Sequence, residues 1–191
     1  RVVKYRGSVH GTNEYPFLID EGGFSVLPIT STGLTHTVSN ERVSSGVERL
    51  DAMLDGEGFY RGSTIMVAGT PGTGKTSFGA SFVNAACLRG EKCLYFSFEE
   101  SPDQIVRNMQ SIGIDLGPHI EGGLLDIHSS RPTMHGLEMH LVMLLKQVQE
   151  KQPRVVVIDP LTDLIAIGST KDVKVMLTRL IDYLKTNRIT A

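Results

Sequence analysis

The sequence predicts an α/β fold in which helices cover both faces of a parallel sheet, preceded by a β-hairpin. From Arg42 onward, short and continuously apolar runs alternate with longer stretches whose apolar residues recur at helical spacing. Unbroken apolar strands between helices are typical of parallel sheets that are buried on both sides. A glycine-rich loop at 69–76 joins one such strand to a helix, and the Asp-Glu-Gly-Gly turn at 20–23 separates two strand-like runs.

The composition fits a folded protein with a real core. The chain has 191 residues, of which 40% are apolar and 21% charged, and its formal net charge is −2. These values exclude a disordered or collagen-like chain and give no global reason to expect nucleic acid as a partner. No apolar run reaches the roughly 18 residues that a membrane span needs, and the opening residues lack the apolar stretch of a signal peptide. Cys87 and Cys93 have no CxxC spacing, which fits a reduced, cytoplasmic protein.

The first 28 residues are predicted to be β structure without a core of their own. Strand-like runs lie at 2–6, 15–19 and 24–27. The next segment, 29–41, is polar and rich in Thr and Ser, as expected for a linker. The main domain therefore begins at residue 42.

Each element of the main domain has a local signal. The helix expected at 75–89 has one apolar face and stops at Gly90. Ser101 is an N-cap followed by a proline, and the apolar stripe after it ends at Gly113. The next helix starts at Leu137 and ends before Pro153. A last helix is expected at 172–185, and the strands are expected at 63–68, 92–98, 124–128 and 154–159.

The clearest functional signal is the segment Gly-Thr-Pro-Gly-Thr-Gly-Lys-Thr at 69–76, which fits the phosphate-loop pattern GxxxxGK(S/T). Glycines let backbone N–H groups converge on phosphate oxygens, and the helix N-terminus adds about half a positive charge there. We expect Lys75 to reach the β- and γ-phosphates of ATP and the Thr76 hydroxyl to bind Mg²⁺. The alternative is a glycine-rich turn with an unrelated lysine. The expected ATP-binding residues are Gly69, Thr70, Pro71, Gly72, Thr73, Gly74, Lys75, Thr76 and Ser77.

Acidic residues at the ends of two predicted strands complete the expected site. Asp159 ends its strand, the position expected for a second Mg²⁺-site acid that contacts the metal through water. The alternative is a helix N-cap or an ordinary aspartate at a strand end. Glu99 and Glu100 follow another strand, where a carboxylate can deprotonate the water that attacks the γ-phosphate. Because neighbouring side chains on a strand point to opposite sides, we expect Glu99 to be the base and Glu100 to support it. The alternative for the pair is ordinary acidic charge before a helix.

Longer stretches around these motifs resemble one family. Residues 42–77 (RVSSGVERLDAMLDGEGFYRGSTIMVAGTPGTGKTS), 96–101 (FSFEES) and 155–159 (VVVID) are similar to the RecA-type ATPase domain of the KaiC family. The segment at 4–28 (KYRGSVHGTNEYPFLIDEGGFSVLP) is similar to the end of a KaiC domain, where a hairpin closes one ATPase repeat and a linker leads to the next. The resemblance implies a RecA-like P-loop fold that binds and hydrolyses Mg·ATP.

The resemblance also implies a domain order and an assembly. The chain would hold the tail of one ATPase domain at 1–28, a linker at 29–41 and an incomplete second domain at 42–191. The full-length protein would be a homohexamer with ATP between subunits. Its protein partners would be of a clock or signalling type. Ser/Thr autokinase activity is expected from the resemblance alone.

In this family the KxRGxxH segment of one subunit reaches the nucleotide held by its neighbour. By this resemblance Lys4, Arg6, Ser8 and His10 would serve in trans, and Asp20 and Glu21 would lie near the ribose or base. Lysine and arginine there would complement the charge that develops on the γ-phosphate. Without the resemblance, a solvated strand face is the alternative for Lys4 and Arg6.

The sequence departs from the family at two sites. Pro160 follows Asp159, where the clock proteins usually carry Ser, so a hydroxyl role is missing there. Ile112 stands where they carry an aromatic residue, which removes adenine stacking at that position. The Ser/Thr autophosphorylation sites of the clock protein correspond to positions beyond Ala191.

Two other functions remain open from the sequence. A recombinase or helicase motor of the same fold class would need basic DNA-binding loops after Asp159, and the segment 164–174 holds only two Lys and no aromatic residue. A nucleotide-holding assembly module with negligible turnover is favoured only by the missing Ser at position 160. The histidines show no metal-ligand spacing, so no metal other than Mg²⁺ is expected.

Overall fold

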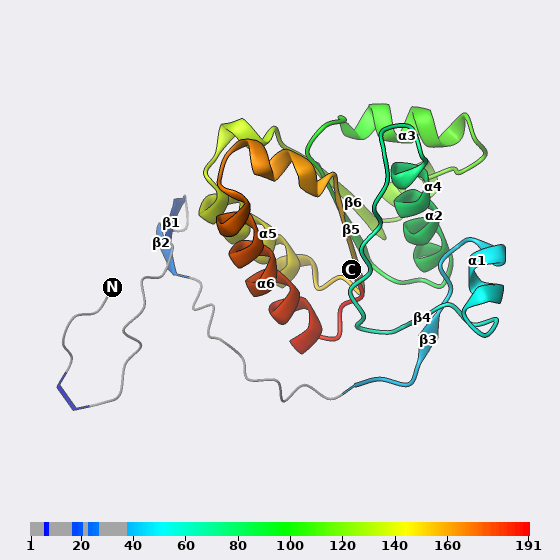
Figure 1. The fold of residues 1–191 in the computed structure, drawn as a ribbon, viewed down its shortest axis with the longest axis horizontal. Coiled ribbons are helices and arrows are strands. Elements are labelled where there is room, and N and C mark those ends of the chain that lie inside the picture. Colours follow the sequence, from blue (N-terminus) through cyan, green and yellow to red (C-terminus); the bar gives the residue numbers. More distant parts are fainter. Residues whose placement is uncertain (1–5, 8–16, 21–22, 27–37) are drawn as a thin grey trace.

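The computed structural model describes residues 6–7, 17–20, 23–26 and 38–191 (Figure 1). An antiparallel hairpin comes first, and β1 lies beside α5. A second antiparallel pair, β3 and β4, precedes the parallel sheet. The elements are β1 (Phe17–Asp20), β2 (Gly23–Val26), β3 (Arg42–Val43), α1 (Glu48–Met53), β4 (Phe59–Tyr60), α2 (Lys75–Leu88), β5 (Cys93–Ser97), α3 (Pro102–Gln110), α4 (Gly117–Glu121), β6 (Leu125–Ser129), α5 (Leu137–Lys151), β7 (Val155–Asp159) and α6 (Thr170–Thr186), with short 3₁₀ helices η1 (Pro132–Met134) and η2 (Leu161–Ala166).

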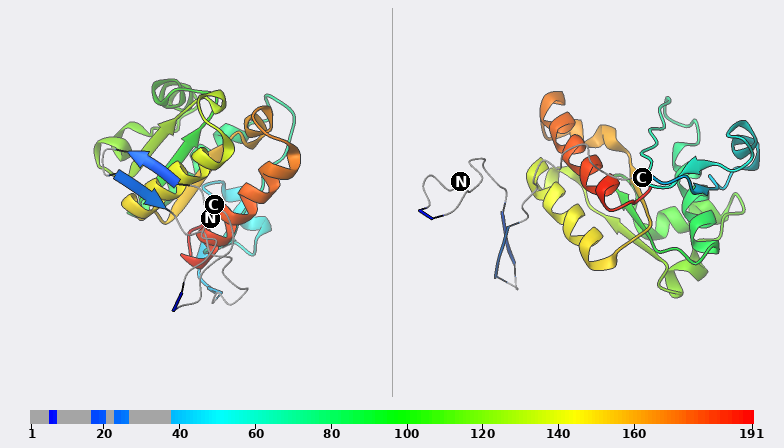
Figure 2. Two further views of the ribbon diagram at one scale, coloured as in Figure 1. Left: turned by 90° about the vertical axis from the view of Figure 1, so that its left-hand side faces the viewer. Right: turned by 90° about the horizontal axis from the view of Figure 1, so that it is seen from below.

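The parallel sheet has the strand order β6-β5-β7 and lies between two layers of helices (Figure 2). Side chains alternate along the central strand β5. Leu94 and Phe96 pack with α5 and α6, whereas Cys93 and Tyr95 pack with α2 and α3. This confirms the prediction of a parallel sheet covered by helices on both faces.

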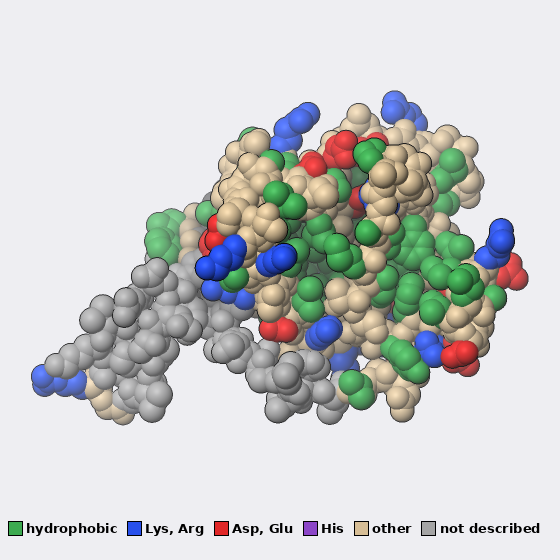
Figure 3. Space-filling view, in the orientation of Figure 1, with side chains coloured by type: hydrophobic (Ala, Val, Ile, Leu, Met, Phe, Trp, Pro, Cys, Tyr) green, Lys and Arg blue, Asp and Glu red, His purple; other side chains and the backbone are tan. Residues whose placement is uncertain are grey.

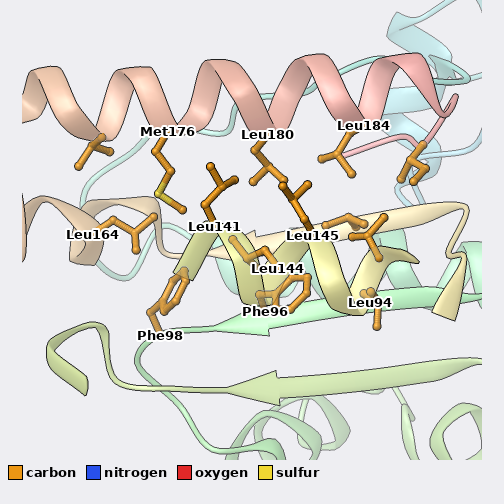
Figure 4. Packing of buried hydrophobic residues seen from close by; sticks show 14 residues of the cluster. Leu94, Phe96, Phe98, Leu141, Leu144, Leu145, Leu164, Met176, Leu180 and Leu184 are labelled. Carbon is orange, nitrogen blue, oxygen red and sulfur yellow. The ribbon is translucent and has the colours of Figure 1, made fainter. Parts of the chain in front are cut away.

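The larger core lies between the sheet and the α5–α6 pair (Figure 4). Leucines from both helices interdigitate there above Leu94 and Phe96 of β5, and Leu164 of η2 closes one end. Apolar side chains at helical spacing along α5 and α6 form this face, which is why both helices were visible in the sequence. The N-cap predicted at Ser101 is confirmed, because Ser101 forms a capping box at the start of α3. Ser169 forms a second capping box, so α6 begins at Thr170, two residues before the expected start.

The strand predicted at 63–68 is absent. Within the described residues, its strand-like hydrogen bonds are two: Ile65 N–H donates to the Ala191 carbonyl (2.7 Å), and Ala191 N–H donates to the Ser63 carbonyl (3.1 Å). In turn, Thr190 forms a parallel bridge with Val155 at the start of β7. Residues 66–68 have no ladder partner in the described part of the chain, and Met66 is 80% exposed. An apolar run shows that a segment can form a strand, but a strand also needs a neighbour.

A tight turn at 44–47 fixes the approach of α1 to α2. The Asp51 carboxylate accepts hydrogen bonds from Ser45 N–H (2.8 Å) and from the Ser44 hydroxyl. Gly46 has a φ of 77°, and a Cβ there would lie far inside the van der Waals distance of the Ser81 carbonyl oxygen on α2. The turn therefore requires glycine for its backbone conformation and for the close approach to α2.

We predict that Gly46→Ala lowers the free energy of unfolding by about 3 kcal/mol or more, since strain at positive φ and overpacking add. Gly90→Ala is the matched control, because Gly90 has a φ of 79° with nothing within 4 Å of the position of a Cβ. The control is expected to lose only about 1–2 kcal/mol. Urea unfolding followed by circular dichroism measures both, and equal losses would show that contact with α2 does not matter.

Arg61 holds the start of the main domain against the loop before β5. Its side chain is only 6% exposed and forms ion pairs with Glu41 (2.7 Å) and Glu91. Burial opposes ionisation of Glu91, but hydrogen bonds from Arg61 and Arg89 outweigh it and hold the pKa of Glu91 below its ordinary value. A carboxyl whose pKa is lowered by folding stabilises the protein above its ordinary pKa, and this stabilisation is lost as the pH falls.

We therefore expect Glu91→Gln to flatten the acid dependence of stability below pH 4.5, the ordinary pKa of the group. At neutral pH the variant should lose about 1–3 kcal/mol, the typical value of a hydrogen bond to a charged partner. Denaturant midpoints at a series of pH values measure both effects. Glu57→Gln, at an exposed residue, is the control, and an unchanged pH profile in Glu91→Gln would contradict the assignment.

Candidate functional site

The candidate site lies at the carboxyl ends of β5 and β7, which pair side by side with Ser97 opposite Asp159. From β5 the chain leaves through α3 toward β6. From β7 it leaves through α6 toward Thr190 on the other side. In open parallel sheets ligands bind where adjacent strands lead away in opposite directions. The topology therefore places the predicted acids at the crevice of the sheet.

The glycine-rich loop has the backbone that its sequence predicts. Gly72 and Gly74 have φ values of 82° and 84°, and a Cβ at Gly69 would lie 2.6 Å from the Thr73 hydroxyl oxygen. Only glycine meets these requirements without strain. Helix α2 begins at Lys75 with no acidic residue in its first turn, so its positive pole is not neutralised locally. The lysine side chain folds back onto the loop, where Lys75 Nζ donates to the carbonyls of Gly69 (3.0 Å) and Thr70 (2.9 Å).

Asp159 joins the strand β7 to the start of α2. Its Oδ2 accepts hydrogen bonds from the Thr76 hydroxyl (2.7 Å) and from the Tyr95 hydroxyl (2.8 Å). Alternation along β7 points Asp159 to the α2 side of the sheet, since Val155 packs on that side and Val156 on the other. Burial, together with the Asp159 carboxylate, raises the pKa of Tyr95, so this hydroxyl stays protonated and donates.

The two adjacent glutamates differ in how they are held. The Glu100 carboxylate accepts a hydrogen bond from Asn108 Nδ2 of α3 (2.9 Å). The Ser97 hydroxyl donates to the Glu100 carbonyl and accepts from the Glu100 N–H. Glu99 is exposed, and its carboxylate has no recorded partner among the described residues. Both line a cavity of about 220 Å³ that Thr76 and Asp159 also line. Glu100 is thus fixed, whereas Glu99 is available to a ligand.

The donor set in this cavity fits a hard divalent cation. Hydroxyl and carboxylate oxygens, here from Thr76, Asp159 and the glutamates, are the ligands that Mg²⁺ prefers. No group of three or more His, Cys, Asp or Glu in the described parts of the chain could hold a metal ion by itself. A cation here would take its remaining oxygen ligands from a bound phosphate and water, as Mg²⁺ commonly does.

A family model described as "ATPase: KaiC" matches residues 43–191. The chain belongs to the KaiC ATPase family. It is 54% identical over its whole length to circadian clock protein KaiC2 of Synechocystis, covering 34% of that protein. It is 42% identical over 85% of its length to the KaiC oscillator protein of Parathermosynechococcus lividus, covering 30% of it. The chain therefore spans about a third of the length of these curated relatives.

Membership confirms the resemblance and the RecA-like P-loop fold, and it implies nucleotide binding by a KaiC-type ATPase domain. The structure brings the phosphate loop, Asp159 and both glutamates together. Of the residues expected in trans, Arg6 is exposed, and for Asp20 only the backbone is described. Lys4, Ser8, His10 and Glu21 lie outside the described residues. Ile112 lies past the end of α3 and is 55% exposed.

Three residues of the site were missed by sequence reasoning. Tyr95, Ser97 and Asn108 bind the predicted acids, yet each belongs to a residue type that is ordinary in a strand or helix. The period of two along β5 is the signal that could have found Tyr95 and Ser97, because it places both on the α2 side with Asp159. Asn108 has no such signal.

Two further observations concern a membrane and nucleic acid as partners. None of the helices in the described residues is long and apolar enough to cross a membrane. On the face shown in Figure 3, Lys and Arg side chains are spread apart with acidic side chains among them.

We predict that Ser97→Ala lowers the free energy of unfolding by about 1–3 kcal/mol, because Ser97 is only 3% exposed and its hydroxyl both donates to and accepts from the Glu100 backbone. Ser129→Ala is the control. The Ser129 hydroxyl donates to the same Glu100 carbonyl at 2.8 Å but is exposed, so its loss should cost under about 1 kcal/mol. Thermal unfolding distinguishes the two, and equal effects would refute a special role for the buried serine.

Proposed function

We propose that this chain binds Mg·ATP at the loop 69–76 and takes part in its hydrolysis. The observation that supports this best is the hydrogen bond between the Thr76 hydroxyl and Asp159. It joins the end of a phosphate-loop motif to the acid at the end of β7, the two parts that nucleotide hydrolases use to hold the metal. The glycine geometry of the loop and the family membership support the same conclusion.

In this proposal the backbone N–H groups of residues 69–76, all except Pro71, surround the phosphates. Lys75 turns from the loop carbonyls to the β- and γ-phosphate oxygens, because an anionic oxygen is a stronger acceptor than a carbonyl. Thr76 and Asp159 would hold Mg²⁺. When bound, Mg²⁺ neutralises charge on the phosphate oxygens.

Glu99 is the proposed general base. It would take a proton from water as the water oxygen bonds to the γ-phosphorus and the bond to the bridging oxygen breaks, giving ADP and phosphate. Glu99 suits this role because it lines the cavity without a recorded partner in the described residues. The carboxylate of Glu100 is already bound to Asn108, so it would support the loop.

The activity of the whole protein is a further part of the proposal, since the chain covers about a third of its relatives. Their names support a circadian role for the full-length protein. A signalling role, a homohexameric assembly and a cytoplasmic location are part of the proposal by family resemblance alone. There Lys4, Arg6, Ser8 and His10 would act on the neighbouring subunit's nucleotide, with Asp20 and Glu21 near the ribose or base. Autokinase activity is proposed by family resemblance alone.

We predict that Glu99→Gln lowers the rate of ATP hydrolysis by about 10²- to 10⁴-fold with little change in ATP affinity, since a general base acts in the transition state. Glu100→Gln should have a smaller effect, and the double variant should bind ATP without hydrolysing it. Phosphate release and fluorescent-nucleotide binding measure the two properties. Glu121→Gln, at an exposed residue of α4, is the control. Full hydrolysis by the double variant would refute the proposed mechanism.

A further inference from the structure

We infer that Tyr95 is a positioning residue for the metal: its hydroxyl fixes the Asp159 carboxylate, so that Thr76 and Asp159 form a prearranged half-site for Mg²⁺. This inference rests on the proposed function and adds a residue to it. Tyr95 is fully buried and would not touch the nucleotide or the metal itself. It acts through Asp159.

The register of the sheet explains how the tyrosine reaches this acid. Tyr95 pairs with Val157, two residues before Asp159 on β7. Two residues of a strand extend about 7 Å, so a side chain as long as tyrosine is needed to reach forward to the carboxylate. Its hydroxyl lies 2.8 Å from Asp159 Oδ2. Phenylalanine would fill the same space but could not donate.

The tyrosine also lies where α2 comes closest to the sheet. A Cβ at Gly79 of α2 would be 3.1 Å from Val157 Cγ1 and 3.6 Å from the Tyr95 hydroxyl oxygen. The absence of a side chain at Gly79 therefore leaves room for the phenol between the helix that carries Thr76 and the strand that carries Asp159. In this position the hydroxyl reaches the same carboxylate oxygen that the Thr76 hydroxyl binds from α2.

Two donors on one carboxylate oxygen determine how the half-site is oriented. An ionised carboxylate only accepts hydrogen bonds, so Thr76 and Tyr95 both donate to Oδ2. The Thr76 hydroxyl has one proton and two lone pairs, and because its proton points to Asp159, its lone pairs remain for a cation. The hydrogen bond from Tyr95 keeps the Asp159 carboxylate from rotating. If the carboxylate rotated, the Thr76 hydroxyl would lose its acceptor and could turn its proton toward the cation site. Residues that orient metal ligands in this way typically contribute 10- to 100-fold to metal affinity.

The experiment compares Tyr95→Phe with the matched control Tyr183→Phe, which makes the same change on α6, on the other side of the sheet. Mn²⁺ serves as the metal probe. Electron paramagnetic resonance of free Mn²⁺ gives its affinity in the presence of ATP, and fluorescent ATP in EDTA gives the metal-free nucleotide affinity. We expect Tyr95→Phe to weaken Mn²⁺ binding about tenfold or more. Its metal-free nucleotide affinity should stay within about twofold of the wild type, because the phosphate loop is unchanged. Tyr183→Phe should change neither.

The outcomes separate this inference from the proposed function. If the wild-type protein fails to bind ATP in EDTA or fails to bind Mn²⁺ with ATP, the proposed function fails and the inference with it. If the wild type binds both and Tyr95→Phe has the same Mn²⁺ affinity, the inference alone is overturned. A Tyr95→Phe protein that loses metal-free ATP binding as well would show a structural role and would also overturn it.

Discussion

The contact on which the site depends is the hydrogen bond from the Thr76 hydroxyl to Asp159. It joins two segments that are far apart in the sequence, the first turn of α2 and the last residue of β7. For the bond to form, α2 must lie close to the sheet, and Gly79 provides that closeness beside Val157. The end of β7 must also lie beside the end of β5, which the parallel pairing of Ser97 with Asp159 provides. The site is thus a consequence of how one helix packs on two strands.

The strict alternation along β5 and β7 separates stability from chemistry. On one face, leucines of α5 and α6 bury Leu94 and Phe96 in an apolar core. On the other face, the same strands end in polar residues, Ser97 and Asp159, close to the loop that precedes α2. Hydroxyls and carboxylates can be accommodated at this end of the sheet because they have hydrogen-bond partners, as Asp159 has in Thr76 and Tyr95.

Sequence reasoning succeeded where local patterns alone decide the structure. Apolar runs located the three strands of the parallel sheet, capping and helical spacing located the main helices, and the loop motif located Lys75 and Thr76. It failed at 63–68, because whether a strand forms depends on a partner, and the sequence does not show that only Ser63 and Ile65 meet one, at Ala191. It also missed Tyr95 and Asn108, because their roles arise from contacts between distant segments. The alternation along β5 gives the side of the sheet on which Tyr95 lies but not its partner, and Asn108 has no local signal.

The pair Glu99-Glu100 shows how the same residue type can acquire two roles. The Ser97 hydroxyl holds the Glu100 backbone, and Asn108 of α3 binds the Glu100 carboxylate. These contacts leave Glu100 little freedom to follow a reacting water. The same contacts fix the backbone next to Glu99 without restraining its side chain, which can then adjust to a ligand in the cavity. A fixed backbone beside an unrestrained carboxylate fits the role proposed for Glu99, because a general base must first lie within reach of the proton that it takes.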